Sequence, residues 1–317
     1  MSEPEAPKRK KKRRRPPRWL MHIVWRVEAV AYDAMIALLR ALPVDTASNF
    51  GAWMGKTFGP LGAHHHVART NLKIAFPDMP EDERQRLLMA VWDNVGRTFA
   101  EFAFVDRLGP GSGRTEVVGL ERLHAIRDAG KPVVFVSGHL ANWELMMATL
   151  VWAGVPSHTA YRPTNNPYVD KRIREGRARY GVELLSPKGK GGRDLMLSMR
   201  RGVSVAMLID QKFNQGIQVP FFGKPAPTMP GAARMAVQYG AAIQPLSVER
   251  LGGARFRMIV EDPIELPEGL DREALIEAGT RLINERLEAR IRRKPDDWFW
   301  VHRRWPREVY RKAASAG

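Results

Sequence analysis

A short apolar run in the middle of the chain, VVFV at residues 133–136, is its clearest hydrophobic pattern. Lys131-Pro132 precede this run and Ser137-Gly138 end it. An unbroken β-branched and aromatic run between turn residues is typical of a strand that is buried on both faces of a sheet. We therefore expect this strand to lie at the centre of the fold.

Helical and strand-like patterns alternate after this strand. We expect helices at residues 145–152, 166–179, 192–200, 230–239 and 271–293, and strands at 157–161, 182–185, 203–209, 242–250 and 254–261. The stretch from residue 210 to residue 228 is expected to be irregular. Such alternation predicts an α/β fold with a mostly parallel or mixed central sheet flanked by helices. Before the central strand, the patterns predict helices at 45–58, 69–76, 80–105 and 119–129, with a loop at 109–113.

The segment 19–42 is a long apolar stretch with few charges. At helical spacing, His22, Arg26, Asp33 and Arg40 form one polar stripe, and apart from Glu28 the rest of the surface is apolar. A membrane-embedded or deeply interfacial helix fits this pattern, and a buried core helix is the alternative. We divide the chain into a disordered basic tail (1–18), a membrane-associated helix (19–42) and an α/β domain (43–310).

The charge of the chain is strongly positive, +17 at pH 7 over 317 residues. Part of it lies in KRKKKRRR at residues 8–15, and the remainder of the chain is basic as well. Nucleic acid, an anionic bilayer or phosphorylated substrates would each suit this charge. A basic run directly before an apolar helix favours the cytoplasmic leaflet. The sequence has no cysteine, which excludes disulfides, thiolate metal sites and cysteine nucleophiles.

Residues 139–144, HLANWE, carry the main candidate chemistry. His139 falls at the carboxyl end of the central strand, where open α/β sheets bind ligands. We expect Asn142 to cap the next helix and Glu144 to fold back towards His139. A carboxylate on one imidazole nitrogen would leave the other nitrogen free to take a proton from a hydroxyl. The alternative is a buried histidine with a purely structural hydrogen bond.

Other polar groups are expected near the same edge of the sheet. Arg162 follows the next strand and suits a phosphate or carboxylate, and Asp210-Gln211 follow the strand at 203–209. Residues 188–193, KGKGGR, open a helix and suit an anion, although a solvated turn fits equally well. The loop 219–228, VPFFGKPAPT, is apolar enough to wall an acyl-chain groove or to touch a bilayer. No GxSxG, HExxH or kinase motif occurs, and His64-His65-His66 lack ligand spacing for a metal.

Taken together, these motifs resemble the late acyltransferases of lipid A biosynthesis, within the lysophospholipid acyltransferase superfamily and its glycerolipid acyltransferase-like fold. The resemblance runs from about residue 19 to residue 305 through NLKIAFP, SGHLANWE, YRP, the KGG loop, LIDQ, VPFFGKPAPT and QPLSVER. It implies that His139 is the general base and that Glu144 orients it. The implied substrate-binding residues are Arg162, Lys188, Arg193, Asp210, Gln211, Phe222, Gly223 and Thr228, with Pro245 in a fourth block. Lys212 stands where many relatives have a second acid.

The resemblance also implies a reaction. A fatty acyl thioester, on acyl carrier protein or coenzyme A, would donate its chain to the hydroxyl of a 3-hydroxyacyl group on a lipid A precursor. Transfer would be direct, without cofactor or metal, and the backbone amides after His139 are candidate donors to the oxyanion. The implied partners are acyl carrier protein and an anionic membrane surface, and no nucleic acid is expected. The implied location is the cytoplasmic face of the inner membrane.

Two alternatives stay open from the sequence. In the first, the protein acylates another lipid, such as a lysophospholipid or a glycosylated phosphatidylinositol, because acyltransferases for those lipids share the same motifs. In the second, the chain is a membrane-bound scaffold or nucleic-acid-binding protein that acts through its basic arm. Donor chain length, carrier, acceptor position, oligomeric state and whether helix 19–42 spans the bilayer are not fixed by the sequence.

Overall fold

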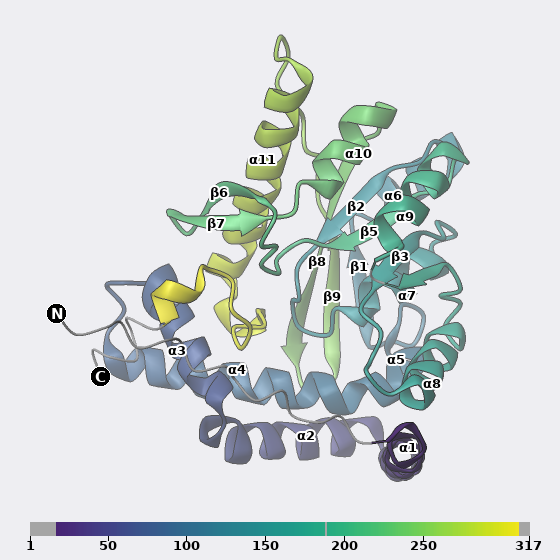
Figure 1. Ribbon diagram of the computed structural model, residues 1–317, viewed down its shortest axis with the longest axis vertical. Helices are drawn as coiled ribbons and strands as arrows, with labels where there is room; N and C mark the ends of the chain where they lie inside the picture. The colour runs from purple at the N-terminus through teal and green to yellow at the C-terminus, as the bar shows by residue number, and fades with distance from the viewer. Residues whose placement is uncertain (1–16, 188, 311–317) are drawn as a thin grey trace, which may run out of the picture.

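A seven-stranded sheet forms the middle of the molecule in the computed structural model, which describes residues 17–187 and 189–310 (Figure 1). The strand order is β1-β9-β8-β2-β5-β3-β4. The strands are β1 Thr115–Val118, β2 Val134–Ser137, β3 His158–Tyr161, β4 Leu185–Pro187, β5 Val205–Leu208, β8 Ile243–Gly252 and β9 Arg255–Val260. The basic run at residues 8–15, and with it most of the predicted tail, lies outside the described residues.

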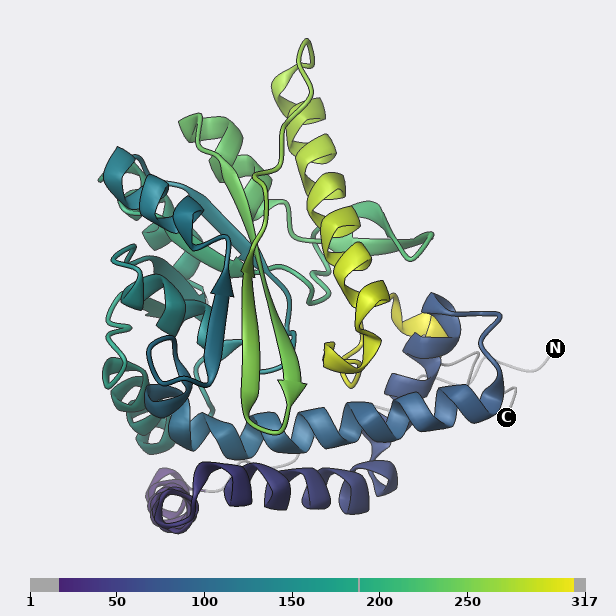
Figure 2. The ribbon, with the colours of Figure 1, turned by 180° about the vertical axis from the view of Figure 1, so that it is seen from behind.

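Helices cover both faces of this sheet and one end of it (Figures 1 and 2). They are α1 Arg18–Ala41, α2 Val44–Phe58, α3 Ala63–Ala75, α4 Glu81–Glu101, α5 Val105–Leu108, α6 Leu120–Ala129, α7 Glu144–Trp152, α8 Pro167–Ala178, α9 Gly191–Arg200, α10 Gly231–Tyr239 and α11 Arg272–Arg293. Short 3₁₀ turns occur at Gly59–Leu61, Phe102–Phe104 and Pro295–Asp297.

Strand β2 lies near the centre of the sheet and pairs in parallel with both β5 and β8. Strands β3 and β4 continue the sheet in parallel beyond β5. The pair of β8 with β9 is antiparallel, and β1 pairs in parallel with β9. The prediction of an α/β fold with a mostly parallel sheet flanked by helices is therefore confirmed.

Alternate residues of the central run enter two separate hydrophobic cores. Val134 and Val136 pack with side chains from α9, α10 and α11, whereas Val133 and Phe135 pack with side chains from α5, α6 and α7. All four side chains are buried. Burial on both sides is what an unbroken apolar strand requires, so the position of β2 follows directly from its sequence.

Helices α2 and α4 run antiparallel and pack closely along their lengths, below the ends of the strands (Figure 2). A Cβ atom on Gly96 would lie 2.0 Å from the carbonyl oxygen of Gly51, and one on Gly51 would lie 2.4 Å from the carbonyl oxygen of Gly96. Only glycine permits so close an approach of two backbones. This contact brings the N-terminal helices against the edge of the sheet at which His139 is found.

Helix α1 occupies the segment that was expected to be helical at 19–42, and Ala29 and Leu39 are its buried residues. Within residues 17–187 and 189–310, no helix combines the length and apolar character needed to cross a bilayer.

Some elements differ from the sequence-based prediction. The stretch expected to be irregular contains a hairpin, with β6 at Ile217–Phe221 and β7 at Lys224–Thr228. Phe222 and Gly223 form its turn with φ angles of 50° and 68°. Two prolines within β7 obscured the strand pattern, because proline cannot donate a ladder hydrogen bond. Strand β1 was not predicted.

Candidate active site

His139 lies two residues after Ser137, the last residue of β2, at the carboxyl edge of the sheet. A Cβ atom on Gly138 would lie 3.2 Å from Asp210 Oδ2 and 2.8 Å from the side chain of Leu287. Glycine at this position therefore lets the chain leave the strand close to the carboxylate of Asp210. The side chain of His139 is 13% exposed, so it is shielded from bulk water but accessible.

Asp210 is the carboxylate that binds the imidazole. Its Oδ1 lies 2.7 Å from His139 Nδ1, and its Oδ2 accepts the backbone N–H of His139 at 2.7 Å. Asp210 follows β5, the parallel neighbour of β2, so the carboxyl ends of the two strands meet. The carboxylate is fully buried. Its two hydrogen bonds to one residue fix both the tautomer and the orientation of the ring.

The electrostatics of this pair suit a general base. Burial opposes the ionisation of Asp210, but the charge and hydrogen bonds of His139 hold the pKa of Asp210 well below its ordinary range. With Nδ1–H donated to Asp210, the lone pair of Nε2 remains available to a proton. The side-chain amide of Gln211 lies 3.4 Å from this nitrogen. The arrangement can therefore accept a proton at Nε2 while Asp210 stabilises the resulting imidazolium.

The prediction that Glu144 binds the imidazole of His139 is wrong. The carboxylate of Glu144 instead accepts hydrogen bonds from Arg177, with Nε 2.9 Å from Oε2, and from the hydroxyl of Tyr180 at 2.7 Å. Burial opposes its ionisation, and the guanidinium of Arg177 more than offsets this and lowers the pKa of Glu144. The physical reason is that Asp210 already occupies Nδ1 and that a guanidinium is a stronger partner for a buried carboxylate.

The turn between His139 and α7 also differs from its prediction. Ala141 has a φ of 43°, and Asn142 does not cap the helix but donates its side-chain amide to Glu101 at 3.3 Å. Two of the expected oxyanion donors are engaged elsewhere: the N–H of Leu140 donates to the carbonyl oxygen of Gly138 at 2.8 Å, and that of Ala141 to the carbonyl oxygen of Asp297 at 2.7 Å. The backbone amides of residues 139–141 are therefore engaged within the protein.

A cavity of about 940 Å³ lies beside this turn, between α1, α2, α4 and α8. Trp143 lines it and is also in edge-to-face contact with the ring of His139, at 4.9 Å between centroids. One part of the lining is apolar and contains Met35, Ile36, Phe50, Met54, Phe99 and Phe102. Another part is charged and contains Glu144, Arg162, Arg172, Arg177 and Arg179. The cavity is thus amphipathic and is separated from His139 by the ring of Trp143.

The remaining sequence-predicted residues fall in three places. Arg162 lines the large cavity, and Asp210 and Gln211 contact His139. Arg193 is exposed on α9 and does not line the cavity, and Lys188 lies outside the described residues. Phe222, Gly223 and Thr228 belong to the β6–β7 hairpin and do not line it either. Their predicted roles in substrate binding stay predictions.

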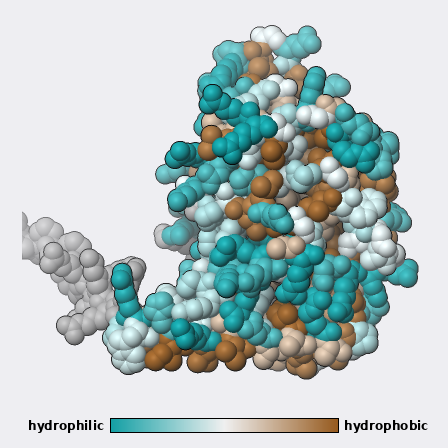
Figure 3. Space-filling view, turned by 90° about the vertical axis from the view of Figure 1, so that its right-hand side faces the viewer, coloured by the Kyte–Doolittle hydropathy of each residue, from teal (hydrophilic) through white to brown (hydrophobic). Residues whose placement is uncertain are grey.

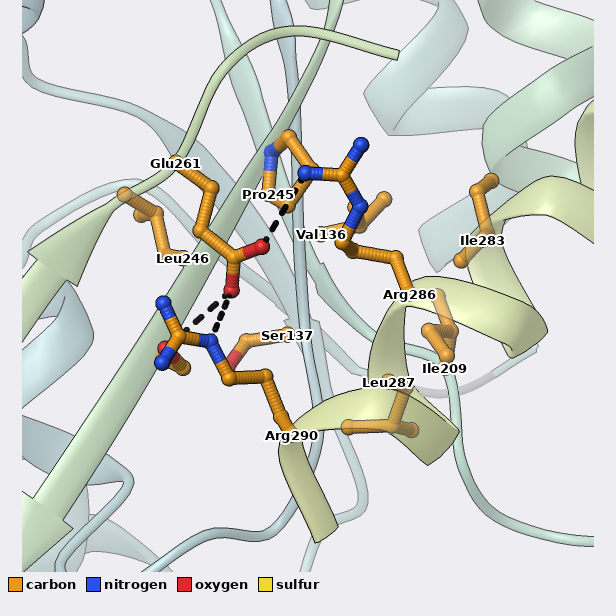
Figure 4. A pocket seen from close by; sticks show the side chains of 11 residues that line it. Val136, Ser137, Ile209, Pro245, Leu246, Glu261, Ile283, Arg286, Leu287 and Arg290 are labelled. Carbon is orange, nitrogen blue, oxygen red and sulfur yellow. Dashed lines mark hydrogen bonds and ion pairs between the residues drawn. The ribbon is translucent and has the colours of Figure 1, made fainter. Parts of the chain in front are cut away.

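A second cavity, of about 20 Å³, lies between the sheet and α11 (Figure 4). Pro245 lines it, and Glu261 accepts hydrogen bonds there from Arg290 at 2.6 Å and from Arg286 at 3.3 Å. Its volume corresponds to about one water molecule, which is too small for a substrate. Pro245 and these ion pairs therefore belong to the packing between the sheet and α11.

The histidine run of α3 makes structural contacts. His64 Nδ1 lies 2.9 Å from the carbonyl oxygen of Val301, and His65 accepts the indole N–H of Trp92 at 3.0 Å. Among the residues that the structure describes, no group of three or more His, Asp or Glu side chains is placed to hold a metal ion.

Sequence reasoning missed several residues of the site. Trp143, Arg177 and Tyr180 line the cavity, and the indole N–H of Trp298 donates to Asp210 Oδ2 at 2.8 Å. The Trp143 side chain was detectable as part of the HLANWE motif. Arg177, Tyr180 and Trp298 come from distant segments, and only the fold brings them to His139 and Glu144.

The chain matches the family described as bacterial lipid A biosynthesis acyltransferase over residues 6–307. It is 25% identical to the lipid A biosynthesis lauroyltransferase of Escherichia coli K12, over 84% of this chain and 88% of that protein. It is also 25% identical to a lipid A biosynthesis acyltransferase of Haemophilus influenzae, over 94% and 92%. A phosphatidylinositol mannoside acyltransferase of Mycolicibacterium smegmatis is 25% identical over 88% and 91%. The chain is therefore an acyltransferase and belongs to the bacterial lipid A biosynthesis acyltransferase family.

Proposed function

We propose that this acyltransferase works at the inner membrane, on its cytoplasmic face, and moves a fatty acyl chain from a thioester to a hydroxyl of a lipid A precursor. The observation that carries the proposal is the His139–Asp210 pair beside an amphipathic cavity of about 940 Å³. A base held by a buried carboxylate suits proton removal from an alcohol. A large cavity with apolar and cationic walls suits a phosphorylated lipid.

The proposed step is direct transfer. Nε2 of His139 takes the proton of the acceptor hydroxyl as the oxygen attacks the thioester carbonyl, and Asp210 stabilises the imidazolium. Collapse of the tetrahedral intermediate breaks the carbon–sulfur bond, and the imidazolium returns its proton to the leaving thiolate. The side-chain amide of Gln211 lies 3.4 Å from Nε2 and is our candidate for stabilising the charge on the oxyanion.

The two kinds of wall in the cavity suggest how the substrates lie. The apolar side chains of α1, α2 and α4 suit a fatty chain, and burying each CH₂ group contributes about 0.8 kcal/mol. Arg162 and Arg179 are exposed at the cavity, where a guanidinium can form two hydrogen bonds with a phosphate. Arg177 is held by Glu144 and Arg172 by Asp33, so they shape this cationic wall.

The membrane location is supported by a surface on the two N-terminal helices. Large apolar side chains are exposed there: Trp19, Ile23, Val27, Val30 and Leu38 on α1, Phe50, Trp53 and Phe58 on α2, and Leu61 just after α2. Figure 3 shows apolar residues gathered along the bottom edge of the molecule, where these helices lie. An apolar face of this kind favours burial at the boundary of a bilayer. The basic run at residues 8–15, immediately before α1 in sequence, would add attraction to anionic headgroups.

Vesicle binding tests this location. We expect the full chain to sediment with vesicles that contain anionic lipid, and the double variant Val27→Glu/Val30→Glu to bind at least about tenfold more weakly, because two charges would enter the apolar interface. Leu270→Glu changes an exposed leucine just before α11, outside the α1–α2 surface, and serves as the control. Equal vesicle binding by the double variant and the control would refute the proposed surface.

Acyl transfer by the purified protein tests the reaction. Acyl–acyl carrier protein and acyl coenzyme A are each offered with a lipid A precursor, and the product is weighed by mass spectrometry. We expect the precursor to gain one acyl group with the wild type and none with His139→Ala. Failure of the wild type with every donor, or full activity of His139→Ala, would overturn the proposal.

A phosphatidylinositol mannoside is the second candidate acceptor. Its basis is the mycobacterial relative, which is as similar in sequence as the lipid A enzymes. Both acceptors carry phosphate and fatty chains, so the cavity suits either one. In the same assay, acylation of the mannoside in preference to the lipid A precursor would select this alternative and leave the catalytic role of His139 unchanged.

A further inference from the structure

The C-terminal segment 297–305, DWFWVHRRW, lies against the catalytic turn. The carbonyl oxygen of Asp297 accepts the N–H of Ala141 at 2.7 Å, and the N–H of Phe299 donates to the carbonyl oxygen of His139 at 3.0 Å. Leu140 and Trp298 form a short antiparallel bridge. A segment more than 150 residues away in sequence is thus hydrogen-bonded to the backbone of His139 itself and to that of Ala141, two residues later.

One side chain of this segment reaches the catalytic carboxylate itself. Trp298 is completely buried, and its indole N–H donates to Asp210 Oδ2 at 2.8 Å. The same oxygen accepts the backbone N–H of His139 at 2.7 Å, which leaves Oδ1 to bind Nδ1 of the imidazole. Two donors on Oδ2 fix the rotation of the carboxylate, so that Oδ1 faces the ring.

We propose that Trp298 is a positioning residue of the reaction: its indole N–H holds the carboxylate of Asp210 in line with His139. The proposal rests on the proposed function only in taking His139 as the base. A carboxylate that lost this donor could turn about its terminal bond, and the imidazole would then spend time in unproductive orientations. The N–H also stabilises the ionised form of Asp210, which the buried site would otherwise disfavour.

Two neighbouring tryptophans provide matched controls. Trp300 and Trp305 are also buried, but the indole N–H of Trp300 donates to the carbonyl oxygen of Pro295 at 2.7 Å. The indole nitrogen of Trp305 has no hydrogen-bond partner among the described residues. Changing each tryptophan to phenylalanine removes a similar volume and one N–H group. Only at position 298 does the lost N–H serve the catalytic carboxylate.

The first test is steady-state kinetics on the full chain. Trp298→Phe is expected to lower kcat by about 10-fold or more with KM within about 2-fold, because the lost hydrogen bond acts on a charged group of the reaction. Trp300→Phe and Trp305→Phe are expected to keep the wild-type kcat. An equal loss of kcat in Trp298→Phe and Trp305→Phe would overturn the proposal.

A second variant guards against a simple packing defect. Benzothienylalanine at position 298 keeps the two-ring shape of tryptophan and replaces N–H by sulfur. It is expected to fold like the wild type, as judged by thermal melting, and to reproduce the kinetic loss of Trp298→Phe. Wild-type kcat with this residue would mean that Trp298 acts through packing alone, and the proposal would be wrong.

A third readout does not depend on knowing the substrates. The proton between His139 Nδ1 and Asp210 is expected to give a downfield ¹H NMR resonance that is absent from His139→Gln. In Trp298→Phe this resonance should shift or broaden, and in Trp305→Phe it should not. This result would stand even if no acceptor were acylated, so failure of the proposed function and failure of this inference can be told apart. An unchanged resonance in Trp298→Phe would contradict the inference.

Discussion

Asp210 and Glu144 both lie near His139, but they face different partners. Asp210 is hydrogen-bonded to the ring and backbone of His139, whereas Glu144 is held by Arg177 and Tyr180 in the wall of the large cavity. A carboxylate that accepts from Nδ1 sets the tautomer of a histidine base and stabilises its charged form. A carboxylate paired with a guanidinium mainly orients that guanidinium.

Neutral amide variants separate these two roles. Asp210→Asn is expected to lower kcat by about 10³-fold or more, because an amide N–H presented to the ring favours the wrong tautomer. Glu144→Gln is expected to lower kcat far less but to weaken substrate binding and to cost about 1–3 kcal/mol of stability, since it leaves Arg177 without its charge partner. Steady-state kinetics and urea unfolding measure both effects. A larger loss of kcat in Glu144→Gln than in Asp210→Asn would return the orienting role to Glu144.

His302 makes the stability depend on pH. Burial lowers the pKa of His302 to about 4, with Asp210 raising it and His139 lowering it further. The folded state therefore keeps this ring neutral at pH values where the unfolded chain binds a proton. Titration of His302 therefore leaves the free energy of unfolding unchanged above about pH 6.5. As the pH falls from about 6.5 to about 4, it lowers this free energy by up to about 3 kcal/mol.

The test compares the wild type with His302→Gln in urea at several pH values. The difference in free energy of unfolding between the two is expected to shrink, or to turn in favour of the variant, as the pH falls through this range. The comparison with the variant is needed because Asp297 also titrates. Burial raises the pKa of Asp297 to about 7, so its ionisation lowers the stability of both proteins as the pH rises, and this effect cancels in the difference. A difference that does not change with pH would contradict the assignment.

Helices α2 and α4 touch along their backbones, and this contact shapes the cavity. Gly51 and Gly96 both line it, and each lies against the carbonyl oxygen of the other. Because a backbone cannot yield as a flexible side chain does, the helix spacing depends on the absence of a Cβ atom at these positions.

Gly96→Ala is accordingly expected to cost about 2 kcal/mol or more, since overpacking outweighs the gain in helix propensity. Gly192→Ala, in the first turn of α9, is the control, because a Cβ atom there meets nothing within 4 Å. The control should be neutral or more stable in urea unfolding. Equal stability of Gly96→Ala and the wild type would show that the helices separate easily, and the close contact would not be a constraint.

Element by element, periodicity predicted most of the chain well. The runs that became β2, β5 and β8 are apolar enough to require burial, and the long helices α4 and α11 have clear apolar faces. The β6–β7 hairpin was missed because prolines hide its alternation, and β1 because TEVV has only two apolar residues and is only partly buried. Short strands depend on their neighbours, which a local pattern does not show.

The candidate site was predictable only in part for a related reason. His139 and Asp210 were each placed at the carboxyl edge of the sheet, but their pairing depends on β5 lying next to β2. Strand order is set by crossover connections and not by local sequence. Glu144 was nearer in sequence and was therefore favoured over Asp210.

At the scale of the whole molecule, three features lie together on one side. The exposed apolar face of α1 and α2, the amphipathic cavity beneath them and the His139–Asp210 pair follow one another from the surface inwards. This order suits the proposed function, in which the chain and phosphate of a bilayer lipid would enter the cavity before its hydroxyl meets His139.

The most direct measurement is the mass of the cellular lipids in a strain that lacks the gene, complemented with either the wild type or His139→Ala. We predict that the deletion yields a lipid lighter by one acyl chain, that the wild type restores the full mass, and that His139→Ala, expressed and folded to the same level, does not. Restoration of the full mass by His139→Ala would contradict the assignment of this histidine as the base.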